Sequence, residues 1–407
     1  MLYISYDGMT DQLGQSQVIP YLRELARQGY EITILSVEKK SKLEKTGKEI
    51  AKQLSDMGIE WETLLFTERP PLLSKIYDQW SVSNKAKKLY KRKKFDFVHC
   101  RSYVAAEAAL KLHRKFSVPF LFDMRGFWVD ERVDSGLWNL KNPLYRFFYK
   151  LYKKKEKNYF KYAAHIVSLT HKGKEELINT YKVPADKISV IPCCVDLAHF
   201  DYQKISSEER GKTKNELGIK DDEKVISYLG SLGGWYMNNE MLDFFKMVKS
   251  KKPGLRFLFI THDSREKIKE IASSKKIDPS DIIVQPASRS EVPLYLSISD
   301  WNIFFIKDAY SKKASSPTKQ GEVMAMGIPI ICNDIGDTGR IINESNSGIV
   351  LKKFSTDEYA KTGESLQDLL LIKKENIREA AIKYFDLKQG VALYQKIYSQ
   401  IVGKIHA

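Results

Sequence analysis

The chain alternates short apolar segments, which predict β-strands, with longer amphipathic segments, which predict helices. In the first half the predicted strands cover residues 2–6, 31–37, 95–100, 119–122, 166–169 and 188–191. In the second half they cover residues 224–229, 256–260, 282–285, 301–306 and 328–332. Strands that alternate with helices form parallel sheets covered on both faces. A chain of 407 residues is longer than a single hydrophobic core usually supports. The two series therefore predict two doubly wound α/β domains.

A polar, charged segment at residues 201–223 separates the two series and predicts the connection between domains. We therefore expect an N-terminal domain at residues 1–200 and a C-terminal domain at residues 201–388. Doubly wound sheets bind ligands beyond the carboxyl ends of their strands. Two such sheets in series predict a cleft between the domains, lined by loops from both.

Charge restricts the partners of the chain. It carries 67 Lys and Arg against 51 Asp and Glu, a net charge of +16, which favours phosphorylated ligands, anionic membranes or nucleic acid. We find no helix-turn-helix or RNA-binding signature and expect no nucleic-acid partner. The N-terminus begins as a strand rather than a signal peptide, and no run of about 18 apolar residues exists, so we expect a cytoplasmic protein. The four cysteines are scattered and no His or Cys cluster is visible, so we expect no metal.

Residues 315–339 are the most informative segment. Ser316 is a good N-cap and Pro317 suits the first helical position, which predicts a helix whose free N–H groups face the cleft. Lys319 adds a positive charge, and Glu322 lies on the same helical face. A cation for phosphate and a carboxylate for ribose hydroxyls suit a nucleotide diphosphate. The alternative is an ordinary capped helix with a Lys–Glu pair on its surface.

This segment resembles the donor-binding motif of the group 1 glycosyltransferases, which implies the GT-B fold: two Rossmann-like domains facing each other across a cleft. In that family a Glu at the position of Glu322 contacts the ribose, ahead of small residues like those at 325–329. A second family Glu, which bonds the donor sugar, falls on Ala314 here. We predict donor binding by Ser315, Ser316, Thr318, Lys319 and Glu322, with Ser315 and Ser316 taking part of the role of the missing glutamate.

The resemblance covers nearly the whole chain. Residues 1–36 resemble the family's first strand, glycine loop and helix, and Gly14 and Gln15 lie where that loop approaches the donor phosphates or the acceptor. VIPCCVDLAHF at residues 190–200 is similar to the signature that closes the first domain. The family also implies a C-terminal helix, at about residues 389–407, that packs back on the first domain.

The turn after Gly230 departs from the family. We include Gly230 and Ser231 in the predicted donor site, but the family usually carries an Arg and, five residues later, a Lys that hold the diphosphate; this chain has Ser231 and Tyr236. GSLGG also fails the NAD-binding pattern G-x-G-x-x-G. Phosphate neutralisation then falls on Lys319, the helix N-terminus and Arg125. Two alternatives of the same fold are a CMP-sugar transferase and a sugar-nucleotide epimerase.

Polar and aromatic residues are densest at residues 120–138. Asp123 and Arg125 follow a predicted buried strand, and Asp130 and Glu131 follow in a predicted loop with tryptophans, whose faces suit sugar rings. We predict that these four residues form the catalytic set. Arg125 would stabilise charge on the leaving phosphate, and Asp130 or Glu131 would orient the acceptor hydroxyl or act as base. The alternative is a structural cluster of ion pairs between these acids and the arginines.

Residues 141–162 combine basic and aromatic residues at helical spacing, which predicts either a membrane-surface helix or a solvated basic helix with an apolar core face. The resemblance implies a retaining glycosyltransferase that needs no metal or cofactor. We predict transfer of a sugar from a nucleotide-sugar donor to a hydroxyl of a glycan or lipid-linked acceptor in cell-surface polysaccharide biosynthesis. Peripheral association with the inner face of the membrane is a further expectation. A basic protein that only binds membrane or nucleic acid is the competing class.

Overall fold

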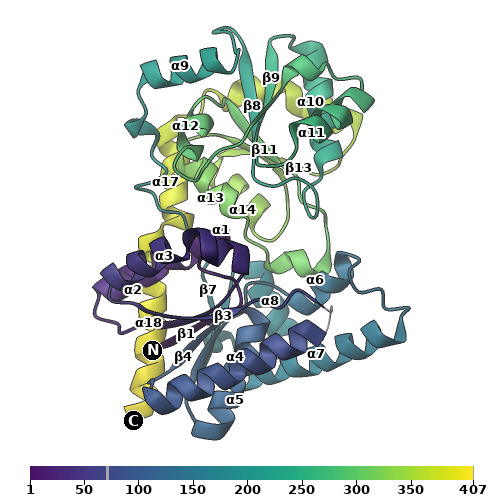
Figure 1. The fold of residues 1–407 in the computed structure, drawn as a ribbon. Helices are drawn as coiled ribbons and strands as arrows, with labels where there is room; N and C mark the ends of the chain where they lie inside the picture. The colour runs from purple at the N-terminus through teal and green to yellow at the C-terminus, as the bar shows by residue number, and fades with distance from the viewer. Residues whose placement is uncertain (70–72, 407) are drawn as a thin grey trace. The chain divides into compact units, whose positions relative to one another are not determined.

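The computed structural model describes residues 1–69 and 73–406, and Figure 1 shows its fold. The chain divides into two compact units. The first contains Met1–Pro192, Tyr310–Ser315 and Leu387–Ala407, and the second contains Cys193–Ala309 and Ser316–Asp386. Residues 193–200, expected from the sequence in the first domain, belong to the second unit, and residues 310–315 belong to the first. Among the described residues, no helix is long and apolar enough to cross a bilayer.

In the described part of the first unit, seven parallel strands form one sheet in the order β3-β2-β1-β4-β5-β6-β7. They are β1 (Leu2–Ser5), β2 (Thr33–Glu38), β3 (Glu60–Leu65), β4 (Val98–Arg101), β5 (Phe120–Asp123), β6 (His165–Ser168) and β7 (Ile188–Val190). The order reverses between β1 and β4, which defines a doubly wound sheet. The apolar pattern missed the edge strand β3, because its sequence EWETLL carries two glutamates.

Helices cover both faces of this sheet. They are α1 (Gln12–Gln17), α2 (Ile19–Arg27), α3 (Lys40–Asp56), α4 (Leu73–Arg92), α5 (Ser102–Phe116), α6 (Trp128–Asp134), α7 (Pro143–Tyr162), α8 (His171–Asn179) and α18 (Leu387–His406). The loop expected around Asp130 and Glu131 is wrong, since both lie in the first turn of α6, where acidic side chains favour a helix. The C-terminal helix α18 packs on α2.

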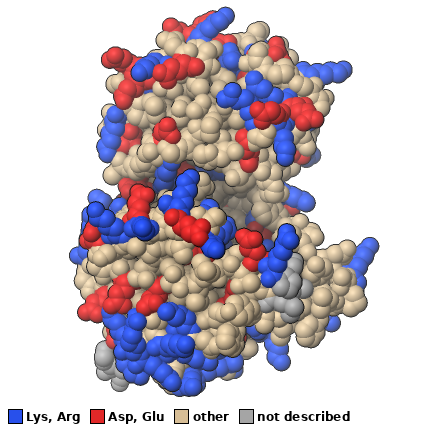
Figure 2. All heavy atoms as spheres, in the orientation of Figure 1, with Lys and Arg blue, Asp and Glu red and all other residues tan. Residues whose placement is uncertain are grey.

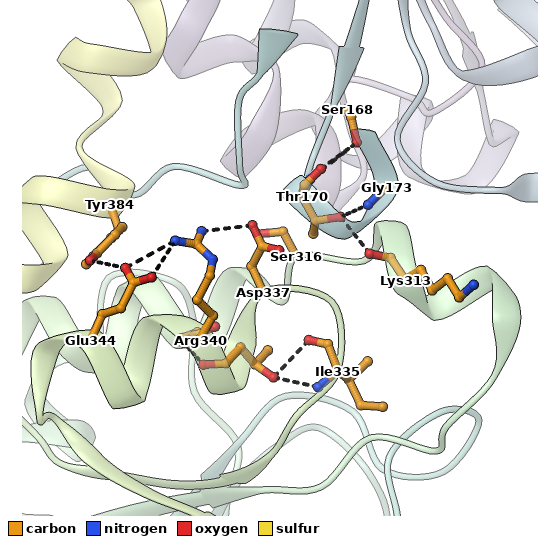
Figure 3. Close-up of polar contacts among 12 residues, drawn as sticks. Ser168, Thr170, Gly173, Lys313, Ser316, Ile335, Asp337, Arg340, Glu344 and Tyr384 are labelled. Atoms are coloured by element: carbon orange, nitrogen blue, oxygen red, sulfur yellow. Dashed lines mark hydrogen bonds and ion pairs between the residues drawn. The ribbon is translucent and has the colours of Figure 1, made fainter. Parts of the chain in front are cut away.

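A 3-10 segment, η4 (Tyr310–Ala314), belongs to the first unit although the chain on either side of it belongs to the second. Figure 3 shows its attachment: the Thr170 hydroxyl donates to the Lys313 carbonyl over 2.6 Å and accepts from the Gly173 N–H over 2.9 Å. Ala314 is fully buried, and a Cβ on Gly173 would lie 2.9 Å from its methyl group. Ala314 therefore occupies a packing position with no room for a larger side chain.

In the described part of the second unit, six parallel strands form a sheet in the order β10-β9-β8-β11-β12-β13. They are β8 (Lys224–Leu229), β9 (Leu255–Ile260), β10 (Ile282–Gln285), β11 (Trp301–Phe304), β12 (Ile330–Asn333) and β13 (Gly348–Leu351). The helices are α9 (Ser207–Glu216), α10 (Asn238–Lys251), α11 (Arg265–Ser274), α12 (Val292–Ser297), α13 (Thr318–Ala325), α14 (Thr338–Ser345), α15 (Thr356–Glu364), α16 (Leu366–Leu369) and α17 (Lys374–Phe385). The order again reverses, between β8 and β11, so each unit is doubly wound as predicted.

Candidate functional site

Helix α13 begins one residue later than the sequence predicts. Pro317 is the N-cap and Thr318 the first helical residue. The predicted N-cap, Ser316, instead accepts a hydrogen bond from the Cys193 N–H over 3.2 Å. The N-terminus of α13 therefore has no side-chain cap. Such an end keeps its N–H groups for another acceptor.

Lys319 is buried, with 7% of its surface exposed, so the alternative of a Lys–Glu pair on the surface is wrong. Its ammonium lies 4.0 Å from the ring centroid of Tyr228 and 3.5 Å from that of Tyr236. Among the described residues Nζ has no hydrogen-bond partner. Burial lowers the pKa of Lys319 well below its ordinary value, against an opposite effect from Glu322.

Glu322 lies one turn along the same helix and is also 7% exposed. Its Oε1 forms an ion pair with Arg289 Nη1 over 3.1 Å. Burial raises the pKa of Glu322, although Arg289 and Lys319 act in the opposite direction. Sequence patterns did not single out Arg289, which lies three residues before α12.

The turn after β8 lies next to Lys319. Gly230 has φ +107°, and a Cβ there would sit 3.2 Å from the Lys319 ammonium, so a larger residue would be both strained and crowded. The carbonyl of Ser231 accepts a hydrogen bond from the Tyr228 hydroxyl over 2.6 Å, and the N–H of Leu232 donates to Asp263. The turn is thus fixed by its own unit, with Lys319 at its start.

Asp123 is the last residue of β5 in the first unit, and it is buried. Its Oδ2 lies 3.6 Å from His99 Nε2, 3.8 Å from Arg101 Nη1 and 3.7 Å from Arg125 Nη1. The Tyr394 hydroxyl of α18 donates to it over 3.3 Å. Burial acts to raise the pKa of Asp123, but Arg125, His99 and Arg101 together hold it below its ordinary value.

Arg125 adopts a left-handed backbone, with φ +59°, and its side chain is 11% exposed. Non-glycine residues in this conformation are uncommon and cluster at functional sites. The predicted emergence of Asp123 and Arg125 at the carboxyl end of β5 fits this arrangement. His99 and Arg101, from the neighbouring strand β4, complete the cluster, and the sequence did not assign them to it.

Asp130 and Glu131 lie apart from this cluster in the contacts they make. Asp130 accepts hydrogen bonds from Tyr149 and Lys153 of α7, over 2.9 and 2.8 Å. Glu131 forms an ion pair with Lys312 of η4 over 2.9 Å. The alternative of structural ion pairs therefore describes Asp130, whereas Glu131 has an ion-pair partner but keeps a side chain that is 38% exposed. The partners of both acids are lysines rather than the expected arginines.

The tryptophan faces proposed for sugar rings are covered in the first unit. Trp128 stacks on Tyr103, and the Arg132 guanidinium lies 4.9 Å from the Trp128 ring centroid. Trp138 is buried and packs edge-on against Trp128. These rings build the core beside α6 rather than an open platform.

The loop between β1 and α1 is fixed by Glu38 at the end of β2. Its carboxylate accepts hydrogen bonds from the N–H groups of Met9 and Thr10, over 2.7 and 3.1 Å. Gly14 is buried, and a Cβ there would lie 2.2 Å from the Gly8 carbonyl oxygen, so only glycine fits. Gln15 is exposed and donates back to the Thr10 carbonyl over 3.3 Å.

The structure therefore brings the predicted residues together in two groups, one in each unit. In the second unit Gly230 and Lys319 meet at the carboxyl end of β8, with Glu322 one turn further along α13, and in the first unit Asp123 and Arg125 meet at the carboxyl end of β5. In the parts of the chain that the structure describes, no three His, Cys, Asp or Glu side chains gather where they could hold a metal ion. Independence from metal stays a prediction.

Two doubly wound units, each with charged residues at the carboxyl ends of its central strands, define a chain of the GT-B class. Solved structures agree: the Anabaena protein Alr3699/HepE, solved in complex with UDP and glucose, matches over 98% of both chains with a TM-score of 0.72 at 11% identity. Family models match in each half, "Glycosyltransferase Family 4" at residues 16–199 and "Glycosyl transferases group 1" at residues 209–384. The chain belongs to the group 1 glycosyltransferases, as its sequence motifs indicate.

Two curated relatives give partial matches. The alpha-monoglucosyldiacylglycerol synthase of Streptococcus pneumoniae is 26% identical over 218 residues, 52% of this chain. The putative teichuronic acid biosynthesis glycosyltransferase TuaC of Bacillus subtilis is 22% identical over 191 residues, 47% of this chain. The matched stretch spans less than half of each relative, 46% and 44% of their lengths.

Proposed function

We propose that the protein transfers a sugar from a nucleotide-sugar donor to a hydroxyl group of an acceptor. The observation that carries this proposal is the pair of buried, oppositely charged residues Lys319 and Glu322 at the start of α13. Lys319 lies beside Gly230 at the carboxyl end of β8, where doubly wound sheets bind nucleotides, and Glu322 lies one turn further along α13. Membership of the group 1 glycosyltransferases and the UDP bound to Alr3699/HepE support it.

In this proposal the donor contacts follow from the chemistry of α13. Glu322 accepts hydrogen bonds from the ribose hydroxyls, which replace its ion pair with Arg289. Lys319 and the uncapped N–H groups at Thr318 bind phosphate. Ser315 and Ser316 lie directly before the helix and stay candidates for contact with the donor sugar.

In the first unit we propose an electrostatic role for Arg125. Its guanidinium stabilises negative charge that develops on the leaving phosphate, and Asp123 holds it in place. Asp130 is engaged by α7, so we assign it a structural role, and Glu131 remains the proposed acceptor ligand or base. From the family resemblance we also propose that the sugar's anomeric configuration is retained.

The experiment that tests the proposed function is a nucleotide screen by thermal shift and calorimetry with UDP, GDP, CMP and dTDP. We expect one nucleoside diphosphate to raise the melting temperature, and the corresponding nucleotide-sugar to be hydrolysed or consumed. A response to CMP alone would favour the CMP-sugar transferase. Absence of any response at millimolar nucleotide would contradict the glycosyltransferase assignment.

The acceptor is proposed to be a surface glycan or a lipid-linked sugar. The printed names of the two relatives, a diacylglycerol glycolipid synthase and a teichuronic acid glycosyltransferase, support this class of acceptor. Such an acceptor lies at a membrane, so we further propose peripheral association of the first unit with an anionic membrane surface.

Helix α7 offers part of that surface. Tyr152, Tyr159 and Phe160 are buried, so α7 has the apolar core face that the solvated-helix alternative required. Near its N-terminus, however, Leu144 and Phe147 are 52% and 61% exposed. Exposed apolar side chains on a basic helix are typical of interfacial binding.

Helix α4 offers the other part. Ile76 and Trp80 are 46% and 58% exposed in its first half. Figure 2 shows Lys and Arg side chains gathered over its C-terminal part, where Lys88, Lys91 and Arg92 are exposed. Basic residues attract anionic lipid by about 1 kcal/mol each near the surface.

Flotation with phosphatidylglycerol vesicles tests the membrane proposal. We expect the protein to float with anionic vesicles at low salt and less with phosphatidylcholine vesicles. Phe147→Glu and Trp80→Glu should each reduce flotation. Leu371→Glu is the matched control, since Leu371 is 81% exposed but lies in the second unit. Equal loss with all three variants would contradict a specific membrane-binding face.

A further inference from the structure

The Lys319 ammonium lies between two aromatic rings, and within the described part of the chain it has no hydrogen-bond acceptor. Tyr228 comes from β8 and Tyr236 from the turn that follows, and both ring centroids lie within 4.0 Å of Nζ. An ammonium over an aromatic face is attracted by the ring's quadrupole, most strongly where water is excluded. The rings hold the cation without using its N–H donors in conventional hydrogen bonds.

The ammonium lies where a donor phosphate would approach the second sheet. A Cβ on Gly230 would come within 3.2 Å of Nζ, so the cation lies against the backbone at the carboxyl end of β8. Lys319 reaches this point from α13, a helix that follows β11. The charge is thus delivered to the start of the turn from a distant part of the chain.

The turn itself contains no cation. Residues 230–236 read GSLGGWY, without Lys or Arg. Its conformation is fixed by the hydrogen bonds of the Ser231 carbonyl with Tyr228 and of the Leu232 N–H with Asp263. Tyr236, at the end of the turn, contributes its ring to Lys319 rather than a charge to a ligand.

We propose that Tyr236 and Tyr228 are positioning residues that hold Lys319 at the carboxyl end of β8, so that this single lysine of α13 supplies the phosphate contact that the turn after β8 lacks. The inference rests on the proposed function, and it assigns the phosphate specificity of the donor site to a lysine held by two tyrosines. Because the rings occupy the sides of the ammonium, its N–H donors are left for phosphate oxygens, and little ordering is needed when the donor binds.

The ring, and not the hydroxyl, of Tyr236 is the group that this inference requires. Tyr236→Phe keeps the aromatic face and Tyr236→Leu removes it. We choose Tyr236 over Tyr228 because the Tyr228 hydroxyl also bonds the Ser231 carbonyl, so its replacement would disturb the turn directly.

The test compares nucleotides with their nucleosides by calorimetry on the full-length protein: UDP with uridine, GDP with guanosine and CMP with cytidine. We expect Tyr236→Leu to weaken binding of the nucleotide about tenfold and to leave binding of its nucleoside unchanged. Tyr236→Phe should bind both like the wild type. Melting temperature and circular dichroism show whether each variant is folded.

Three outcomes would overturn the inference. Equal loss of nucleotide and nucleoside in Tyr236→Leu would indicate a merely structural role. Loss in Tyr236→Phe as large as in Tyr236→Leu would assign the effect to the hydroxyl. Unchanged nucleotide binding in Tyr236→Leu would remove the positioning role while leaving the proposed function intact. If the wild type binds no nucleotide, the proposed function itself fails.

Discussion

The two charged groups differ in how their central charge is compensated. Asp123, in the first unit, has two arginines and His99 within 4 Å and a tyrosine hydroxyl as donor. Lys319, in the second unit, lies over the faces of two tyrosine rings, and its Nζ has no hydrogen-bond partner among the described residues.

This difference indicates which of the two groups binds a ligand. A buried charge with partners of its own contributes to the fold, and its removal leaves those partners uncompensated. A buried charge without partners costs folding free energy, and an incoming opposite charge offsets that cost. We therefore expect substitutions in the first group to lower stability and substitutions in the second to lower ligand affinity.

The largest effect is expected for Asp123→Asn. Losing this carboxylate removes a buried counter-charge that Arg101 and Arg125 share, and we expect the free energy of unfolding to fall by about 3 kcal/mol. Denaturant unfolding measures this fall, with Asp56→Asn, an exposed aspartate at the end of α3, as control. Unchanged stability would show that the Asp123 carboxylate and its partners do not stabilise the fold.

Acid unfolding sharpens the same comparison. The folded-state pKa of Asp123 lies below its unfolded value, so its contribution to stability is present above the unfolded pKa and is lost as pH falls through the folded one. We expect Asp123→Asn to flatten the acid limb of the stability profile. A profile parallel to that of the wild type would contradict the lowered pKa.

Lys319→Met should produce the next largest effect, on binding. We expect nucleotide affinity to fall about 100-fold, because the Lys319 ammonium lies against Gly230 at the start of the turn after β8 and is the proposed phosphate contact. Thermal stability should not fall, since an ammonium without an acceptor is removed. Isothermal titration calorimetry measures the affinity and differential scanning calorimetry measures the thermal stability. The control is Lys246→Met, which replaces an exposed lysine of α10. A loss of stability without a loss of affinity would contradict the conclusion that Lys319 serves ligand binding rather than the fold.

Glu322→Gln should weaken nucleotide binding by about tenfold, through loss of a charged acceptor for ribose hydroxyls. Its folded-state pKa is raised, so between the unfolded and folded pKa values stability falls as pH rises. Removing that carboxylate should therefore raise the melting temperature slightly at pH 7. It should also lower the affinity for the nucleoside, which carries the ribose without the phosphates. A Gln variant that binds uridine, guanosine and cytidine as the wild type does would separate Glu322 from the ribose.

The smallest effect concerns the backbone of Arg125. Its φ of +59° is unstrained for glycine, so Arg125→Gly should be more stable than Arg125→Ala by about 1 kcal/mol. Both variants should lose sugar transfer equally, because both lack the guanidinium. Equal stability would indicate that the left-handed conformation relaxes once the ion pair with Asp123 is gone.

Much of the fold and of the candidate site can be predicted from the sequence, because it depends on residues close together in the chain. The alternation of apolar strands and amphipathic helices predicted two doubly wound units, and spacing alone placed Lys319 and Glu322 on one helical face. Local signals also misled: Ser316 and Pro317 match the preferences of a helix start, but the Ser316 hydroxyl accepts from Cys193, so Pro317 takes the cap position. A residue 123 positions away in sequence decided that contact.

By itself the sequence determined the fold class, the family and the helix that carries the candidate donor site, because strand and helix periodicity and motif spacing are properties of neighbouring residues. The partners and the pKa values of Lys319 and Glu322 depend on the tertiary structure. The rings around Lys319 and the arginine on Glu322 come from segments remote in the chain, and burial, which shifts the pKa values of both, exists only once those segments pack. Tertiary packing likewise buried Ala314 in the first unit, at the position where the family has a sugar-binding glutamate.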